Sequence, residues 1–183
     1  RTLEKLRHDP AVESAALVRS LPLTGNEQFS AVRVDGQDPK DERFASHMVV
    51  SSGYFGALRI PWIAGRDFND ADRAESQPVA IVNEAFVRRF WPKQTNPIGQ
   101  RLQLGRESTF LTVVGVARDV HQTAVGEPPQ PEVYRPHAQS GDPGMMLVAR
   151  GRGDAGRAVT AIRAAVAEAD PEQPVFRLGS MEA

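Results

Sequence analysis

The chain has 183 residues, enough for one domain of ordinary size or for two small lobes. Apolar residues make up 40% and charged residues 25%, which allows a buried core and argues against disorder. The formal net charge is −1, from 22 basic and 23 acidic side chains. No excess of positive charge therefore directs the chain toward nucleic acid or an acidic membrane surface.

Cysteine is absent, which excludes disulfides, thiolate nucleophiles and cysteine-based metal centres. No apolar stretch approaches the roughly 20 residues that a membrane-spanning helix requires, and there is no signal peptide. The first residue is Arg1, and residues 2–6 already have a helical pattern. We therefore expect a piece of a longer protein whose anchor or targeting segment lies elsewhere.

The first third predicts a short helix, three strands and a second short helix. The opening helix should stop near Pro10, because the residue before a proline disfavours helical angles. Residues 11–20, 29–34 and 43–50 are β-compatible apolar runs bounded by turn residues. A helix through Leu58 should follow, capped by Ser51 or Ser52.

The middle of the chain is dense in turn signals. Residues 78–82 predict a compact buried strand, and Asn83 predicts the N-cap of the helix that follows. Phe86 and Phe90 are four residues apart and should share one face of that helix. Further predictions are strands over 102–104 and 110–116 and a proline-rich connection over 126–136.

The last third predicts a strand over 145–149, a helix capped by Asp154 that ends near Asp170, and a closing strand over 174–178. One apolar stripe should line this helix, formed by Val159, Ile162, Val166 and Ala169. A strand–helix–strand unit normally places both strands in one sheet. Together the elements indicate an α+β fold.

The segment from Gly151 to Gly156 matches the G-x-G-x-x-G pattern of dinucleotide-binding loops and lies between a strand and a helix. That fold needs several strand–helix units, however, and only one remains before the chain ends. Asp154 would also place a carboxylate where the pyrophosphate binds. A flexible turn followed by a helix cap explains the pattern better.

Three other sets of side chains lack the pattern that a functional site requires. Acidic residues at 67–72 fail the calcium-loop pattern, because Asp72 occupies its glycine position and Pro78 its last ligand position. Asp119 and His121 would share a strand face but lack a third catalytic partner. The remaining histidines and the four large aromatic residues have no metal or base-stacking pattern, and core packing explains the aromatics better: His8, His47, His137, Tyr54, Trp62, Trp91 and Tyr134. We therefore predict no catalytic, cofactor or metal residue.

Several short segments follow one another in a fixed order. They are Ser52-Gly53-Tyr54-Phe55, Ile60-Pro61, Gly65-Arg66-Asp67-Phe68, Val79-Ala80-Ile81-Val82-Asn83-Glu84-Ala85-Phe86, Pro97-Ile98-Gly99-Gln100-Arg101-Leu102, Val113-Val114-Gly115-Val116-Ala117-Arg118-Asp119-Val120 and Pro131-Glu132-Val133-Tyr134. In this order the segments resemble the MacB-like periplasmic core domain of FtsX-like ABC permeases, especially duplicated orphan permeases.

The resemblance implies a domain inserted between two membrane helices of a permease. It also implies two lobes: a porter-like lobe from residues 1–58 and 143–183, and a strand-rich lobe inserted over 59–142. The expected role is non-catalytic: contacting partners or substrate, and transmitting conformational change from the membrane helices. Implied partners are those helices, a second permease copy or half, a cytoplasmic ATPase acting through the membrane part, and a periplasmic adaptor.

Two other functions are compatible with the sequence. One is an enzyme or nucleotide-binding domain that uses the loop from Gly151 to Gly156 or the pair Asp119–His121. The other is a sensor whose two lobes close on a small ligand in the cleft between them.

Overall fold

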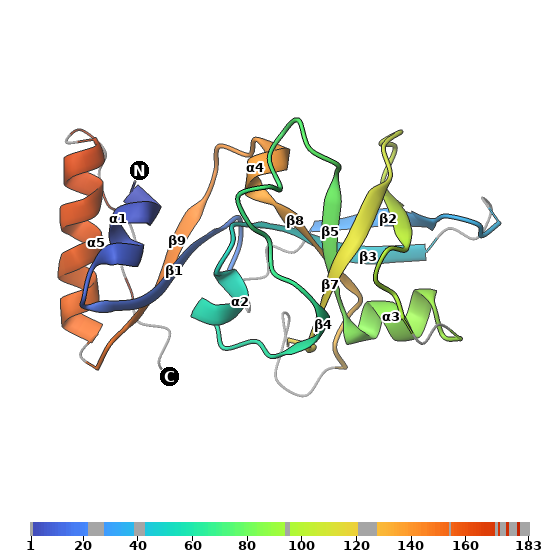
Figure 1. The fold of residues 1–183 in the computed structure, drawn as a ribbon, viewed down its shortest axis with the longest axis horizontal. Coiled ribbons are helices and arrows are strands. Elements are labelled where there is room, and N and C mark those ends of the chain that lie inside the picture. Colours follow the sequence, from blue (N-terminus) through green and yellow to red (C-terminus); the bar gives the residue numbers. More distant parts are fainter. Residues whose placement is uncertain are drawn as a thin grey trace.

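The structure is a computed structural model in which residues 2–21, 28–38, 43–93, 96–120, 128–153, 155–170, 172, 175 and 179 are described (Figure 1). In chain order, its elements are α1 (Thr2–His8), β1 (Val12–Val18), β2 (Gln28–Val34), β3 (Arg43–Val50), α2 (Tyr54–Ala57), β4 (Trp62–Gly65), β5 (Val79–Asn83), α3 (Glu84–Phe90), β6 (Arg101–Leu104), β7 (Leu111–Ala117), β8 (Glu132–Pro136), α4 (His137–Ser140), β9 (Met146–Gly151) and α5 (Ala155–Ala169). None of the described helices has the length and hydropathy needed to cross a membrane.

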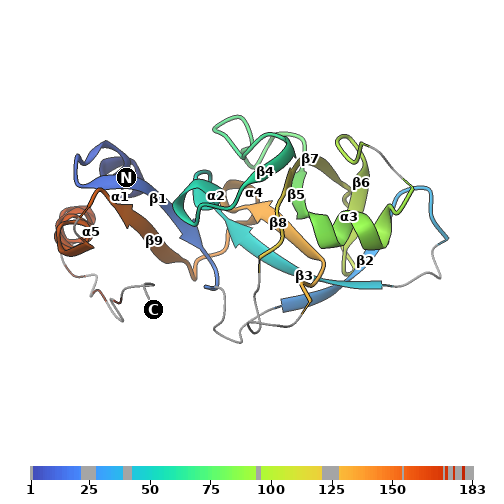
Figure 2. The same cartoon turned by 90° about the horizontal axis from the view of Figure 1, so that it is seen from below.

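Six of these strands close on one another to form a small barrel. The pairings run from β2 through β6, β7, β5, β8 and β3, and β3 pairs again with β2. Closure leaves no free edge within the ring, which removes the exposed backbone groups of an open sheet. Figure 2 shows β2 and β3 below the other barrel strands, at the end of the molecule away from α5.

Side chains alternate between the two faces of the barrel wall. In β5, Ala80 and Val82 belong to the interior cluster, whereas Ile81 belongs to a cluster on the outer face. In β8, Val133 faces inward and Tyr134 outward in the same way. This period of two is expected of strands that are covered on both sides. The outer cluster lies between the barrel and the elements α2, β1 and β9.

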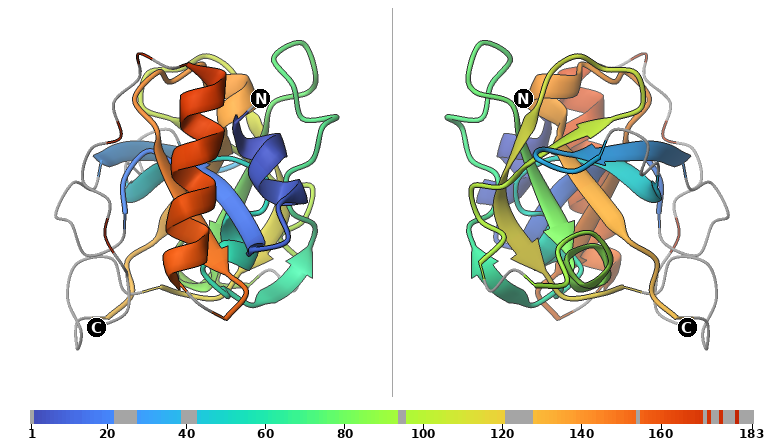
Figure 3. Two further views of the ribbon diagram at one scale, coloured as in Figure 1. Left: turned by 90° about the vertical axis from the view of Figure 1, so that its left-hand side faces the viewer. Right: turned by 90° about the vertical axis from the view of Figure 1, so that its right-hand side faces the viewer.

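The first and last described helices lie together at the other end of the molecule. Both α1 and α5 pack against β1 and β9 (Figure 3, left), and their shared core includes Leu6 and Val12. The buried stripe of α5 consists of Ala158, Ala161 and Ala165. The predicted stripe is therefore wrong by part of a turn. The small alanines allow α5 to pack closely on its neighbours, while the bulkier valines and isoleucine stay half-buried at the edge of the contact.

Several sequence predictions are confirmed by the structure. Strands lie at 12–18, 28–34, 43–50, 79–83, 101–104, 111–117 and 146–151. The Asn83 side chain accepts a hydrogen bond from the Phe86 backbone N–H, as an N-cap does. Phe86 and Phe90 stack with their ring centroids 4.2 Å apart. Asp154 and most of the predicted strand 174–178 lie outside the described residues.

Three further predictions are wrong. The proline-rich segment contains β8, a buried strand in which proline occurs only at the last position, Pro136. The helix α2 has Gly53 at its N-cap with no side-chain bond, and Ser51 Oγ instead accepts from the Leu17 N–H. Trp62 is 39% exposed and contacts Phe55, whereas Tyr54, Trp91 and Tyr134 are buried as predicted.

Strand pairing does not follow the proposed lobe ranges everywhere. Strands β2 and β3 come from the range assigned to the porter-like lobe, but they complete the barrel with β6 and β8. Beyond the barrel, β3 meets β1 at the pair Val18–Val50, and β1 pairs with β9 over most of its length. All nine described strands therefore belong to one continuous sheet. The fold is of mixed α+β type and rich in sheet.

β4 pairs with β7 in antiparallel fashion, and two glycines allow the two backbones to come very close where they meet. We call this contact the close crossing. Gly65 pairs with Gly115, and the Arg66 N–H donates to the Val114 carbonyl at 3.0 Å. A Cβ atom on Gly65, whose φ is +76°, would lie 2.2 Å from the Val114 oxygen. A Cβ atom on Gly115 would lie 2.4 Å from the Arg66 oxygen. Because both obstacles are backbone atoms, they cannot rotate away.

We predict that Gly115→Ala lowers the free energy of unfolding by about 3 kcal/mol or more, because the strands must separate to admit the methyl group. The matched control is Gly56→Ala in α2, where a Cβ meets nothing within 4 Å, so the same change should be neutral or stabilise by up to about 1 kcal/mol. Urea unfolding followed by circular dichroism measures both. Equal stabilities for the two variants would contradict the close crossing.

Candidate functional site

The glycine loop from Gly151 to Gly156 is the clearest sequence motif. Before α5, the part of it that the structure describes is a strand end followed by a turn. Gly151 ends β9, and Gly153 has a φ of +85°. Arg152 folds back so that its Nε donates to the Val12 carbonyl at 3.2 Å, while its backbone N–H donates to Ala11. These contacts tie the turn to β1. They give the motif a structural role at the edge of the terminal unit, the name we use for α1, β1, β9 and α5 together.

The pair Asp119–His121 can be followed only at Asp119, because His121 lies outside the described residues. The Asp119 carboxylate accepts from the Ala85 N–H at 2.7 Å with one oxygen and from Arg88 at 2.7 Å with the other. It therefore binds the first turn of α3, where a negative charge is favourable. Both oxygens thus have partners that belong to the scaffold.

The described histidines each bond to a polar group that belongs to the fold. Nδ1 of His8 lies 2.7 Å from the Glu4 carbonyl, and Nε2 of His137 lies 3.0 Å from the Asp142 carbonyl. His47 contacts Ser30 Oγ at 3.2 Å. Burial, with further contributions from Arg135 and Arg19, lowers the pKa of His47, so its ring is neutral at physiological pH. In none of these contacts does a carboxylate orient the imidazole.

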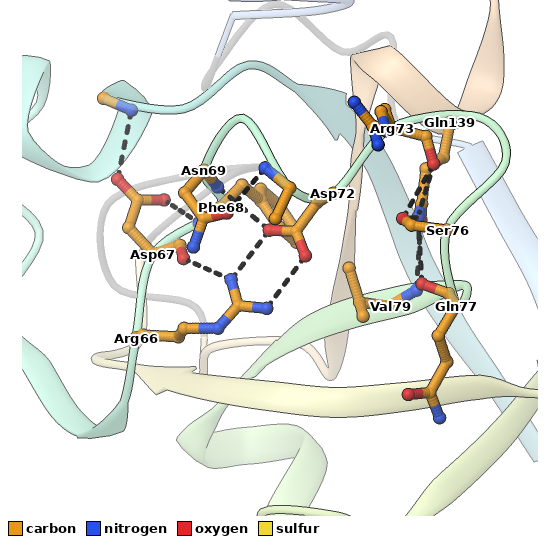
Figure 4. Close-up of polar contacts among 12 residues, drawn as sticks. Arg66, Asp67, Phe68, Asn69, Asp72, Arg73, Ser76, Gln77, Val79 and Gln139 are labelled. Carbon is orange, nitrogen blue, oxygen red and sulfur yellow. Dashed lines mark hydrogen bonds and ion pairs between the residues drawn. The ribbon is translucent and has the colours of Figure 1, made fainter.

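The acidic residues of 67–72 build a compact loop, which we call the strap (residues 66–78). Arg66 forms two hydrogen bonds with the Asp72 carboxylate, at 2.7 and 2.8 Å, and Asp72 also accepts from the Asn69 N–H (Figure 4). Asp67 accepts from the Gly53 and Phe68 backbone N–H groups. Phe68, which belongs to the strap, is held between these contacts and is 4% exposed. No group of acidic or histidine side chains in the described ranges could hold a metal ion.

These contacts move the pKa values of the two carboxyl groups in opposite directions. The hydrogen bonds from Arg66 lower the pKa of Asp72. Burial raises the pKa of Asp67, and the two backbone donors only partly offset that effect. Asp72 is therefore the residue whose ionisation stabilises the strap at neutral pH.

The far end of the strap is held by Gln139, which reaches over from α4 (Figure 4). Its Oε1 accepts from the Val79 N–H at 3.0 Å. Its Nε2 lies 3.0 Å from both Ser76 Oγ and the Gln77 carbonyl oxygen. One amide side chain thus pairs backbone groups that would otherwise need water.

A buried polar pair lies on the outer face of β8. Glu132 is 1% exposed, and the Tyr134 hydroxyl donates to its Oε2 at 2.7 Å. Burial raises the pKa of Tyr134 well above its ordinary value, so the phenol stays protonated and remains a donor. The Glu132 N–H in turn donates to the Asn83 side chain. This network joins β8 to the start of α3.

The terminal unit and the barrel meet at a set of contacts that we call the joint, formed by residues Arg7, Leu17, Arg19, Val49, Ser51, Ser52, Ala57 and Arg150. Two backbone bonds cross it: Arg19 N–H to the Val49 carbonyl and Ser51 N–H to the Leu17 carbonyl, both at 2.9 Å. The Arg150 guanidinium donates twice to the Ala57 carbonyl, at 3.0 and 2.8 Å. Arg7 donates to Ser52.

Sequence reasoning missed these residues because their partners are distant along the chain. Arg7 and Ser52 are 45 residues apart, and Arg150 and Ala57 are 93 apart. No local spacing marks such a pair. The one available signal was chemical: Ala57 ends α2, where unpaired helix carbonyls attract cationic donors.

This arrangement, a barrel joined to a terminal helix-and-strand unit, is the fold of extracytoplasmic domains of ABC-transporter permeases. The chain belongs to the MacB-like periplasmic core domain family, whose sequence model matches residues 2–173. It is thus a domain of a membrane-anchored ABC-transporter permease of the MacB/FtsX-like type, placed at the periplasmic or extracytoplasmic face. A comparison with curated proteins gave no match.

Three similar solved structures share the fold at low sequence identity. The periplasmic region of MacB from Actinobacillus actinomycetemcomitans has a TM-score of 0.63 at 14% identity, covering 92% of this chain and 72% of that one. The extracellular domain of the noncanonic ABC-type transporter YknZ from Gram-positive bacteria scores 0.57 at 15% identity, with coverage of 87% and 75%. A domain of a putative permease protein from Porphyromonas gingivalis scores 0.57 at 14%, with coverage of 91% and 68%.

The strap yields a pH prediction. Because the pKa of Asp72 is lowered on folding, its contribution is complete above the unfolded value of about 3.9 and is lost as the pH falls through the folded value. We expect Asp72→Asn to cost about 1–3 kcal/mol at pH 7 and the difference from wild type to vanish in acid. The control is Asp70→Asn, at an exposed strap position. A deficit for Asp72→Asn that is the same at pH 7 and pH 2.5 would exclude this role of the carboxylate charge.

Proposed function

We propose that this domain is a non-catalytic lever that contacts partners and transmits conformational change from the membrane helices of its permease. The observation that carries the proposal is the joint. Side chains and backbone from both parts of the molecule are paired across it, and the sheet runs through it without a break. A body built in this way moves as one piece, so displacement at one end appears at the other.

The contacts of the sequence-predicted sites support a non-enzymatic role. Asp119, the strap carboxylates and the turn at Arg152 have scaffold partners. We therefore propose that the chain contains no catalytic, cofactor or metal residue. Chemistry would be supplied by a cytoplasmic ATPase that acts through the membrane part.

We also propose the two-lobe organisation and the partner set. The porter-like lobe would comprise 1–58 and 143–183 and the inserted lobe 59–142, although the pairing of β2 and β3 argues for counting 28–50 with the barrel. Partners would be the transmembrane helices of the same permease, a second permease copy or half, and a periplasmic adaptor. The balanced charge gives no support for nucleic acid binding.

A spin-label experiment on the full-length permease tests the lever directly. Labels at Arg106 and Arg163, both exposed, report the distance between the barrel and α5, and residues 1–183 contain no cysteine that would compete for the label. In nanodiscs with the ATPase, we expect one narrow distance distribution within each domain that ATP leaves unchanged. The distance between Arg106 labels of two copies should shift with ATP.

Replacing the joint side chains should break this behaviour. The double variant Arg7→Met, Arg150→Met should broaden the Arg106–Arg163 distribution and weaken the ATP-dependent shift between copies. The matched control is Arg152→Met, whose carbonyl partner Val12 lies within the same terminal unit. A wild-type distance within one domain that changes by several ångströms with ATP would overturn the rigid-lever proposal and favour lobes that close on each other.

A further inference from the structure

Two exposed aromatic residues lie on β2 and β3, barrel strands that lie away from α1 and α5 (Figure 1). Phe29 on β2 and Phe44 on β3 are each 54% exposed. The antiparallel register sets Phe29 opposite Ser46 and Ala31 opposite Phe44. The two rings are therefore diagonal neighbours on one face of the hairpin, within reach of each other.

That face is the outer face of the barrel, because Val32, Val34 and Ala45, at the alternate positions, belong to the interior cluster. Arg33 lies on the outer face with the rings, since it is four residues from Phe29 along the same strand, and it is exposed. In the described part of the chain, no acidic side chain forms an ion pair with Arg33. We name this surface, formed by Phe29, Ala31, Arg33 and Phe44, the aromatic patch.

The size and charge of the aromatic patch define its occupant. A phenylalanine side chain has about 200 Å² of surface, so two such side chains that are each about half exposed present about 200 Å² of aromatic surface to solvent. A stable dimer needs about 800 Å² from each partner, four times as much. The patch is thus matched to one or two apolar side chains of a short segment. The positive charge of Arg33 favours a segment that carries a carboxylate. Aromatic residues and arginine are also enriched at protein–protein interfaces.

We propose that the aromatic patch docks a short apolar, acidic segment of an extracytoplasmic partner protein. This inference rests on the proposed function, because a lever delivers its motion through a contact at the end remote from its input. More than half of each ring faces water, and this part of the two phenylalanines contributes nothing to the core of the barrel. A partner that inserts one apolar side chain between the rings, over Ala31, covers both and places its carboxylate at Arg33.

Two tetrapeptides test the proposal on the 183-residue chain. We expect acetyl-Glu-Leu-Leu-Glu-amide to shift the amide resonances of residues 29–33 and 44 with a Kd of about 1 mM, the weak affinity of a small patch. Acetyl-Lys-Leu-Leu-Lys-amide should bind at least tenfold more weakly. The variant Arg33→Glu should reverse this preference, and the variant Phe29→Ser, Phe44→Ser should lose the shifts.

The control variant is Trp62→Ser, Ile63→Ser, which removes the other exposed apolar pair and should leave the titration unchanged. The proposal is overturned if both peptides bind equally, or if the shifts survive loss of both phenylalanines. It is also overturned if Phe29→Ser abolishes a concentration-dependent dimer, or if the patch binds phosphatidylglycerol vesicles more tightly than the acidic peptide. Neither peptide result depends on the joint, so the docking proposal and the lever proposal can fail separately.

Discussion

Strand β3 is the constraint on which the rest of the structure depends. Along its eight residues it pairs with β2 and β8 inside the barrel, and at Val50 it passes to β1 of the terminal unit. A single strand cannot bend sharply at each pairing without losing ladder hydrogen bonds, so its partners in the barrel and in the terminal unit are held in a fixed relation. This strand is the structural basis of the proposed lever.

The outer cluster makes that relation rigid as well as continuous. Ala16 and Val18 from β1, Val148 from β9 and Tyr54 from α2 pack on the barrel strands around Tyr134. The strap covers the same cluster with Phe68. Because interiors pack at close to crystal density, sliding one part over the other would open cavities that cost several kcal/mol. The close crossing of β4 over β7 holds the strap in place.

Local features of this fold could be predicted from sequence because they depend on neighbours along the chain. The Asn83 cap and the stacked pair Phe86–Phe90 follow from spacings of three and four residues. Barrel closure could not be predicted, because no local pattern specifies that β2 pairs with both β3 and β6. Strand β8 was missed because prolines beside a strand resemble prolines within a loop.

The candidate site divides in the same way. The close contact between Gly65 and Gly115 could not be predicted, because nothing local shows that the two glycines face each other. The failed calcium-loop pattern of residues 67–72 could be read from the sequence, but the ion pair Arg66–Asp72 and the contacts of Gln139 with the strap depend on the fold. The joint arginines carried no signal, because a lone arginine on a helix or strand is usually a solvated side chain.

Native-state hydrogen exchange tests the central claim, a barrel and terminal unit that form one cooperative body, most directly. The amide hydrogens of Arg19 and Ser51 cross the joint, and that of Val113 lies in the barrel, where it donates to the Gln100 carbonyl. The account predicts that all three exchange only by global unfolding, with one free energy and one denaturant dependence. Exchange of Arg19 and Ser51 through a lower-energy opening, with Val113 still protected, would contradict it.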